Sequence, residues 1–314
     1  MSKKTKNKKA FIQFSFPWLF ALIVGAFILF LTIYGVTKLI KTQETVQSAK
    51  TSKEIGILLN PLETGFEEAK TNILGFPVKT RIYSKCNPEG IFGRQLIQVS
   101  QLSFNKWTET DIDVGFSNKY IFSSNPSEGK SFLVFTKPFY FPFKVADLTY
   151  IISFDEIYCF INAPEDVEEE INNLNQNNLL TNCSEEFIQE KNAKKVCFGS
   201  SKGCEIKVDY ERGIVEKKQG KVYFSDNSLM YAGIFSNPEV YECQIKRLMK
   251  RAASLADLYL NKIETIGCGD SVKPELSLLT DLSNNLESSR DLNSLDLIAD
   301  EINEKNQKST CRLW

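Results

Sequence analysis

The strongest pattern along the chain is an uninterrupted apolar stretch near its N-terminus. No charged residue occurs from 10 to 37, and five lysines lie within the first nine residues. A helix rises about 1.5 Å per residue, so roughly 20 apolar residues cross the hydrocarbon core of a bilayer. Trp18 and Tyr34 stand near the two ends, where aromatic rings favour the headgroup level. The pattern predicts a basic tail over 1–9 and a transmembrane helix over 10–37.

A cleaved signal peptide is the alternative interpretation of this stretch. Its apolar core would be shorter, about 7 to 15 residues, and would end in small residues at a cleavage site. The stretch here ends Ile-Tyr-Gly-Val-Thr before Lys38, which favours an anchor that is retained. Because cytoplasmic flanks collect lysine and arginine, the basic tail predicts a cytoplasmic N-terminus and an extracytoplasmic C-terminal domain.

Beyond the span, the periodicity predicts first helix and then strand. Residues 38–60 are expected to continue the span as a helical stalk, which ends before Pro61, and residues 62–74 are expected to form a further helix. From Val78 onwards apolar residues alternate with polar ones, which is typical of strands. Short connections between these strands predict a mainly antiparallel sheet. We therefore expect an α+β ectodomain, mostly strands, over 61–235.

The pattern returns to helix after residue 235. Apolar residues recur at spacings of three and four from Tyr241 to Ile266. Ser236 and Glu239 form a capping-box signature at the start of this long helix, and Gly267 follows it as a C-cap.

Two shorter helical stretches follow, over 276–286 and 292–302. We expect the whole region 236–314 to form a C-terminal helical part that packs on the ectodomain.

Composition narrows the classes of function. The chain has 314 residues, a net charge of −1 and no histidine. With charge so closely balanced, a nucleic-acid partner is not expected. Without histidine or a Cys-x-x-Cys spacing, neither a metal site nor a cofactor is expected. The missing histidine also argues against an enzyme, because histidine is the commonest general base.

All eight cysteines follow the apolar stretch, which predicts a disulfide-braced domain in an oxidising compartment. Cys197 and Cys204 flank a glycine- and serine-rich turn, so we expect a disulfide that closes a hairpin. Cys268 and Cys311 flank the two short helical stretches and would meet if these form a helical hairpin. The long helix separates Cys243 from Cys268 by about 37 Å, so these two cannot pair. Three arrangements stay open for the remaining four: Cys86, Cys159, Cys183 and Cys243.

The densest aromatic patch is formed by Phe139, Tyr140, Phe141 and Phe143. If exposed, such a cluster is a candidate interaction surface or a loop that dips into the membrane. The favoured interpretation is that these side chains fill the core of the sheet, since phenylalanine is mostly buried. Two charged clusters, the acids over 165–170 and the basic residues over 246–251, are expected to be solvated helix positions.

The first residues also resemble those of a known family. Lys8-Lys9-Ala10, followed by Phe11-Ile12-Gln13-Phe14-Ser15 and the apolar run, looks like the N-terminus of archaeal type IV pilin-like proteins. The resemblance implies that a peptidase removes a short basic leader, here at Ala10, and that the helix behind it anchors the subunit and can form a filament core. The glutamate usual early in the mature helix is absent, and Phe16-Pro17 stands in that neighbourhood. An uncleaved signal anchor is the alternative.

Together these features predict a single-pass, membrane-anchored cell-envelope protein with a structural or interaction role, of which a pilin-like subunit is one form. Its expected partners are the lipid bilayer and either other envelope proteins or further copies of itself. The alternative is a ligand-binding or accessory ectodomain of a transport or secretion complex, whose ligand the sequence does not name. An envelope hydrolase that uses paired carboxylates is the third interpretation.

Overall fold

The computed structural model describes residues 16–58, 70–103, 105–108, 113–199 and 203–314. The chain divides into a first unit that ends at Gln47 and a second unit that begins at Ser48. The expected basic tail, the expected cleavage at Ala10 and the expected end of the stalk at Pro61 lie outside the described residues.

One long helix, α1 (Phe16–Leu58), covers the described part of the predicted span and most of the predicted stalk. Its portion Phe16–Leu39 is long and apolar enough to cross a membrane, and none of that portion is buried. Trp18 and Tyr34 are both exposed on it, as belt residues must be. By length and composition this helix suits either a membrane anchor or a signal sequence.

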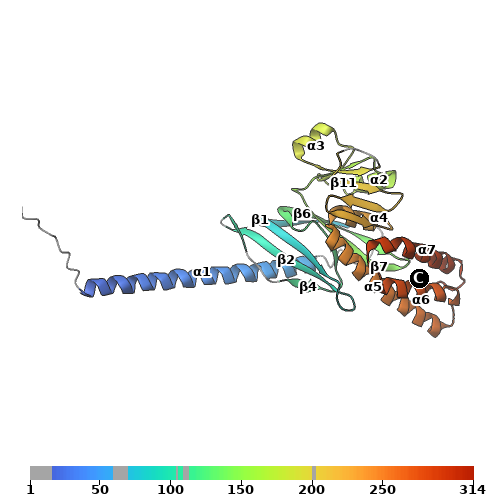
Figure 1. The fold of residues 1–314 in the computed structure, drawn as a ribbon, viewed down its shortest axis with the longest axis horizontal. Helices are drawn as coiled ribbons and strands as arrows, with labels where there is room; N and C mark the ends of the chain where they lie inside the picture. The colour runs from blue at the N-terminus through green and yellow to red at the C-terminus, as the bar shows by residue number, and fades with distance from the viewer. Residues whose placement is uncertain (1–15, 59–69, 104, 109–112, 200–202) are drawn as a thin grey trace, which may run out of the picture. The chain divides into compact units, whose positions relative to one another are not determined.

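The second unit contains two β-sheets (Figure 1), and both are mixed. The first has the strand order β3-β2-β1-β6-β7-β5, with β4 also paired to β2. Its pairs are antiparallel except for β5 and β7, which run parallel. Its strands are β1 (Lys70–Asn87), β2 (Arg94–Ser103), β3 (Lys106–Trp107), β4 (Val114–Phe116), β5 (Tyr120–Phe122), β6 (Ser127–Tyr140) and β7 (Lys144–Ser153).

The second sheet has the order β13-β12-β11-β10-β8-β9. Strands β9, β8, β10 and β11 are mutually parallel, whereas β11, β12 and β13 form antiparallel pairs. Helices α2 (Glu165–Asn173) and α3 (Glu185–Lys191) make the two crossovers that parallel strands require. The strands are β8 (Tyr158–Ile161), β9 (Leu179–Thr181), β10 (Lys194–Phe198), β11 (Ile206–Asp209), β12 (Ile214–Lys217) and β13 (Gly220–Tyr223).

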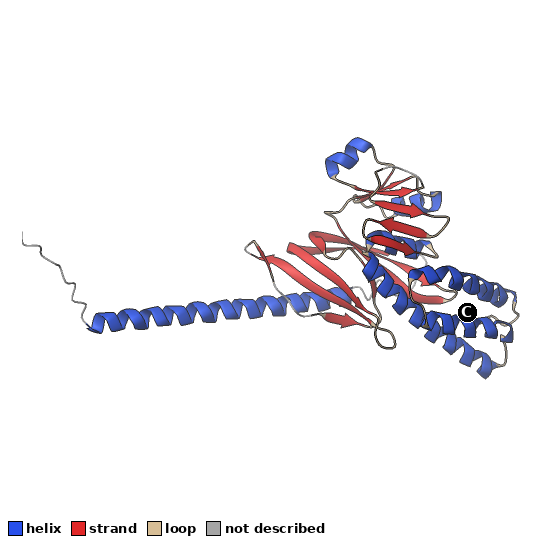
Figure 2. Ribbon diagram, in the orientation of Figure 1, coloured by secondary structure: helices blue, strands red, loops and turns tan. Residues whose placement is uncertain are grey.

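The C-terminal helices lie side by side next to the sheets (Figure 2), with α5 packed on β1, β5, β7 and β13 and α6 packed on both α5 and α7. Two short 3-10 turns precede α6 and α7, at Asp270–Val272 and Ser289–Asp291. The helices are α4 (Asn227–Phe235), α5 (Pro238–Ile266), α6 (Lys273–Asn284) and α7 (Leu292–Lys308). The α+β class, the three C-terminal helices and the short helix at Glu165 were predicted from periodicity and are confirmed.

Four details of the sequence-based fold are corrected. The helix expected over 62–74 is wrong for residues 70–74, the described part of that range, because they belong to β1, which begins at Lys70. The sheet is only in part antiparallel, since the crossovers through α2 and α3 make parallel neighbours. Cys197 lies in β10 and Cys204 lies shortly before β11, and because these two strands run parallel the disulfide does not close a hairpin. The expected capping box at Ser236 is not formed, because Asn237 is the N-cap and provides no side-chain hydrogen bond.

Helix α4 was not predicted, and it lies between the two sheets. It contacts β6 and β7 of the first sheet and β12 and β13 of the second. All side chains from Ser228 to Phe235 are buried, so this helix has no polar face. Gly233 allows the close approach, because a Cβ there would lie 3.1 Å from side-chain carbons of Val215 and Val222.

Helix α5 clamps the turn between β1 and β2. Cys243 forms a disulfide with Cys86, with a Cα–Cα distance of 6.0 Å. Lys250 Nζ donates to the carbonyl oxygens of Pro88 and Gly90, at 2.8 and 3.2 Å. Gly93 has a φ of +57°, and a Cβ there would lie 2.9 Å from Cγ of Arg247. The turn therefore needs a glycine at this position, both for its backbone angle and for contact with α5.

The fully buried Arg247 completes this clamp. Its guanidinium donates to three backbone carbonyls, those of Phe92 (3.0 Å), Lys119 (2.8 Å) and Ser117 (2.9 Å), and to Gln244 Oε1 (2.7 Å). Its Cζ also stands 4.6 Å from the centre of the Tyr120 ring. The basic band expected on the surface of this helix thus includes one residue that is a structural part of the core.

All eight cysteines are paired within the second unit. The disulfides Cys197–Cys204 and Cys268–Cys311 join the residues that the sequence pattern brought together. Of the arrangements left open for the other four, the structure has Cys86–Cys243 and Cys159–Cys183.

Candidate functional site

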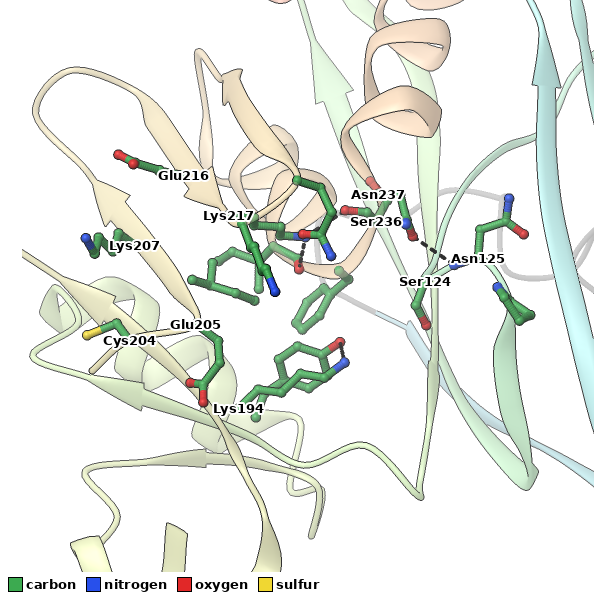
Figure 3. A pocket seen from close by; sticks show the side chains of 17 residues that line it. Ser124, Asn125, Lys194, Cys204, Glu205, Lys207, Glu216, Lys217, Ser236 and Asn237 are labelled. Carbon is green, nitrogen blue, oxygen red and sulfur yellow. Dashed lines mark hydrogen bonds between the residues drawn. The ribbon is translucent and has the colours of Figure 1, made fainter. Parts of the chain in front are cut away.

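A cavity of about 640 Å³ lies between the two sheets (Figure 3). Its polar wall belongs to the second sheet. Tyr158, Lys194 and Ile206 are the first residues of the parallel strands β8, β10 and β11, so their side chains meet at one edge of that sheet. Lys217 ends β12, which runs antiparallel to β11 in the register Ile206 to Lys217, and this places it at the same edge.

The opposite wall comes from the turn between β5 and β6 and from the junction of α4 and α5. The backbone N–H of Asn125 donates to Asn237 Oδ1 at 2.8 Å, which ties these two segments together (Figure 3). Ile234 and Phe235, from the last turn of α4, add apolar surface to the cavity.

The positive charge of Lys194, in the cavity wall, is balanced by the carboxylate of Glu156. Its ammonium group lies 2.9 Å from Glu156 Oε1 and 3.3 Å from the Tyr158 hydroxyl. The same hydroxyl donates to Glu156 Oε2 at 3.1 Å. Burial raises the pKa of Tyr158 well above its ordinary value, and the neighbouring Glu156 carboxylate adds to this, so the hydroxyl stays protonated as a donor.

Lys217 has a different environment. Its ammonium group donates to the carbonyl oxygens of Ile234 and Ser236, both at 2.6 Å, where α4 ends. A cation at a helix C-terminus is favourable. Burial nevertheless lowers the pKa of Lys217 to about 7, and the charge of Lys194 contributes to this in the same direction. Among the residues that the structure describes, no carboxylate forms an ion pair with Lys217.

The cavity lining is positively charged overall. It contains four lysines, Lys194, Lys207, Lys217 and Lys218, and two glutamates, Glu205 and Glu216. Both glutamates are engaged: Glu205 accepts from the backbone N–H of Lys195 at 2.7 Å, and Glu216 pairs with Lys221 at 3.1 Å. The lining therefore offers positive charge that its own acids do not balance.

The aromatic patch belongs mostly to the core, which was the favoured of its two interpretations. Phe139, Phe141 and Phe143 are 2% exposed or less and belong to the core, and of the four residues only Tyr140 is exposed, at 49%. Phe143 packs against Tyr259 and Trp314, from the C-terminal region. The core interpretation is confirmed for the three phenylalanines, and the alternative of an interaction surface is wrong for them.

The acidic residues near Glu168 give no metal site in the described part of the chain, where no group of three or more candidate ligands occurs. Glu168 instead accepts a hydrogen bond from Asn182 Nδ2 at 2.9 Å. The cavity residues themselves were missed from sequence. Lys217 and Lys218 sit beside a Gln-Gly turn, a pattern typical of a solvated hairpin, and nothing local links them to Asn125 or Tyr158.

Comparison with models of protein families, with curated proteins and with solved structures finds no match for this chain.

Proposed function

We propose that the chain is a single-pass membrane protein, with its N-terminus in the cytoplasm and its disulfide-linked unit outside it as a structural or interaction module. The proposal rests on the order of two features along the chain, an exposed apolar helix followed by all of the disulfides. The apolar part of α1 is fully exposed, and all eight cysteines, paired in four disulfides, lie on its C-terminal side. Disulfides persist outside the reducing cytosol, and the lysines before the span favour the same orientation.

This topology predicts a specific labelling result in intact cells. Because the cysteines are oxidised, a membrane-impermeant maleimide should modify none of them until a reductant is added. Protease added outside should digest the second unit and leave the α1 anchor. Detergent-permeabilised cells and a cytosolic marker protein are the controls. Eight free thiols on a domain shielded from external protease would mean that the topology is inverted.

A pilin-like subunit is one form of this proposal, supported by the resemblance of the residues around Ala10. It predicts that the mature protein lacks the basic leader, because a peptidase removes it before the helix joins an assembly. The mass of the N-terminal peptide of the protein isolated from membranes measures this directly. Loss of the leader with an intact helix supports the pilin-like form. A peptide that begins at or next to Met1 contradicts that form and supports an uncleaved signal anchor.

A ligand-binding ectodomain that serves a membrane complex is the second candidate function, and one observation favours it. The cavity between the sheets has the size of small-molecule sites in proteins, which are about 300 to 1,000 Å³. Its walls combine apolar side chains of α4 with a few polar groups that converge on the edge of the second sheet.

A further inference from the structure

Lys217, in the cavity between the sheets, forms no ion pair within the described residues, although the nearby charge of Glu156 favours its protonated form. The nitrogen of Lys217 is at the floor of the cavity, where it caps α4 through the carbonyl oxygens of Ile234 and Ser236. An ammonium group has three N–H donors, and these contacts use two of them. A buried ammonium costs free energy unless it is paired, so the remaining donor favours an acceptor from outside the chain.

We propose that this cavity binds a small organic anion, whose carboxylate or phosphate group accepts a hydrogen bond from Lys217. The inference concerns the cavity alone and holds on either side of the membrane, so it stands or falls separately from the proposed topology.

The charges around Lys217 select an anion over a cation. Lys194 is already paired with Glu156, and the two glutamates of the lining hold other donors. Lys207 and Lys218 line the same cavity, and within the described residues neither forms an ion pair. A ligand cation would meet this excess of lysines, with Glu205 as the one lining carboxylate outside the ion pairs of the described residues, whereas an anion is attracted by the excess.

The walls also indicate what the rest of the ligand is like. Next to Lys217 the surface is apolar, formed by Ile206 of β11 and by Ile234 and Phe235 of α4. An inorganic ion would leave this surface in contact with water, while a compact apolar group attached to the anion would cover it. The cavity volume of about 640 Å³ accommodates a body of that kind.

Titration calorimetry on the full-length chain in detergent tests the proposal with benzoate, phenyl phosphate and the uncharged isostere benzamide. Wild-type protein should bind at least one of the two anions and not benzamide. Binding of benzoate alone or of phenyl phosphate alone identifies the anionic group. Lys217→Met should weaken the binding at least tenfold, and Lys217→Arg should retain it in part. Lys246→Met, outside the cavity lining, should change it less than twofold.

The pH dependence of the wild-type protein gives a second readout, which is needed if Lys217→Met does not fold. Only protonated Lys217 pairs with the anion, and its pKa in the free protein is about 7. The affinity for benzoate, which stays ionised throughout, should therefore fall about tenfold between pH 6 and pH 8. The proposal is overturned if neither anion binds the folded protein at millimolar concentration, if benzamide binds equally well, or if benzoate binds with an affinity that does not change with pH.

Discussion

Replacing Cys86 and Cys243 together with serine should lower the free energy of unfolding by about 5 kcal/mol, the largest effect expected from any one disulfide in this chain. The two cysteines are 157 residues apart, and the chain entropy of the unfolded state that a cross-link removes grows with the logarithm of the loop it closes. The same pair also anchors the β1–β2 turn to α5. Urea unfolding of the full chain in detergent, followed by circular dichroism, measures the loss.

The disulfide Cys197–Cys204 provides the matched control. Its cysteines are only 7 residues apart, and the same entropy relation gives about 2.5 kcal/mol for its removal. The double serine variant at 197 and 204 should thus be clearly more stable than the variant at 86 and 243. Equal losses for the two variants would contradict the argument from loop length.

Replacing Arg247 with methionine should destabilise the second unit by about 3 kcal/mol. Methionine restores much of the volume but donates no hydrogen bonds, so three backbone carbonyls and Gln244 Oε1 lose their donor inside the fold. Lysine at the same position keeps the charge but not the planar fork that reaches four acceptors, so Arg247→Lys should recover only a small part of the loss.

The neighbouring residue on α5 supplies the control for this experiment. Lys246 is only partly buried and belongs to none of these hydrogen bonds, so Lys246→Met should change stability by less than about 0.5 kcal/mol. Urea midpoints of the three variants measure the difference. An Arg247→Met variant as stable as the wild type would show that the freed carbonyls find other donors and that the clamp does not depend on this side chain.

Periodicity was a reliable guide where one face of an element is polar. The spacing from Tyr241 to Ile266 predicted α5, and Gly267 ends that helix with a φ of +66°, as a C-cap glycine should. The alternation at Val78 and beyond predicted β1, since its side chains turn alternately to the core and to solvent. In both elements the sequence pattern records which side faces the core.

The same reasoning explains why helix α4 and the parallel strands were not predicted. Helix α4 is buried on all sides between the sheets, so Asn227–Phe235 contains no polar face and hence no helical period. The parallel strands were missed because β9 spans only Leu179–Thr181, too short for a pattern to be recognised. The alternation of strands with α2 and α3 carries a signal for parallel pairing, but short connections elsewhere in the chain outweighed it.

The cavity could not be predicted because its parts are distant in sequence and ordinary in local pattern. Asn125 and Asn237, which are hydrogen-bonded across one wall, are 112 residues apart. Lys217 reads as the end of an exposed hairpin until β11 and α4 are seen to cover it. The aromatic patch shows the reverse case, because its phenylalanines were expected in the core from their residue type alone, and they are found there.

The pairing of Cys86 has a consequence for biosynthesis. In order of translation Cys86 is the first cysteine and Cys243 the sixth, whereas the other three disulfides each join consecutive cysteines. An oxidase that joined thiols strictly in the order of their synthesis would link Cys86 to Cys159 and shift the next two pairs as well. Formation of the native disulfides therefore requires that Cys86 stays reduced until α5 has been synthesised, or that a disulfide isomerase corrects an early Cys86–Cys159 disulfide.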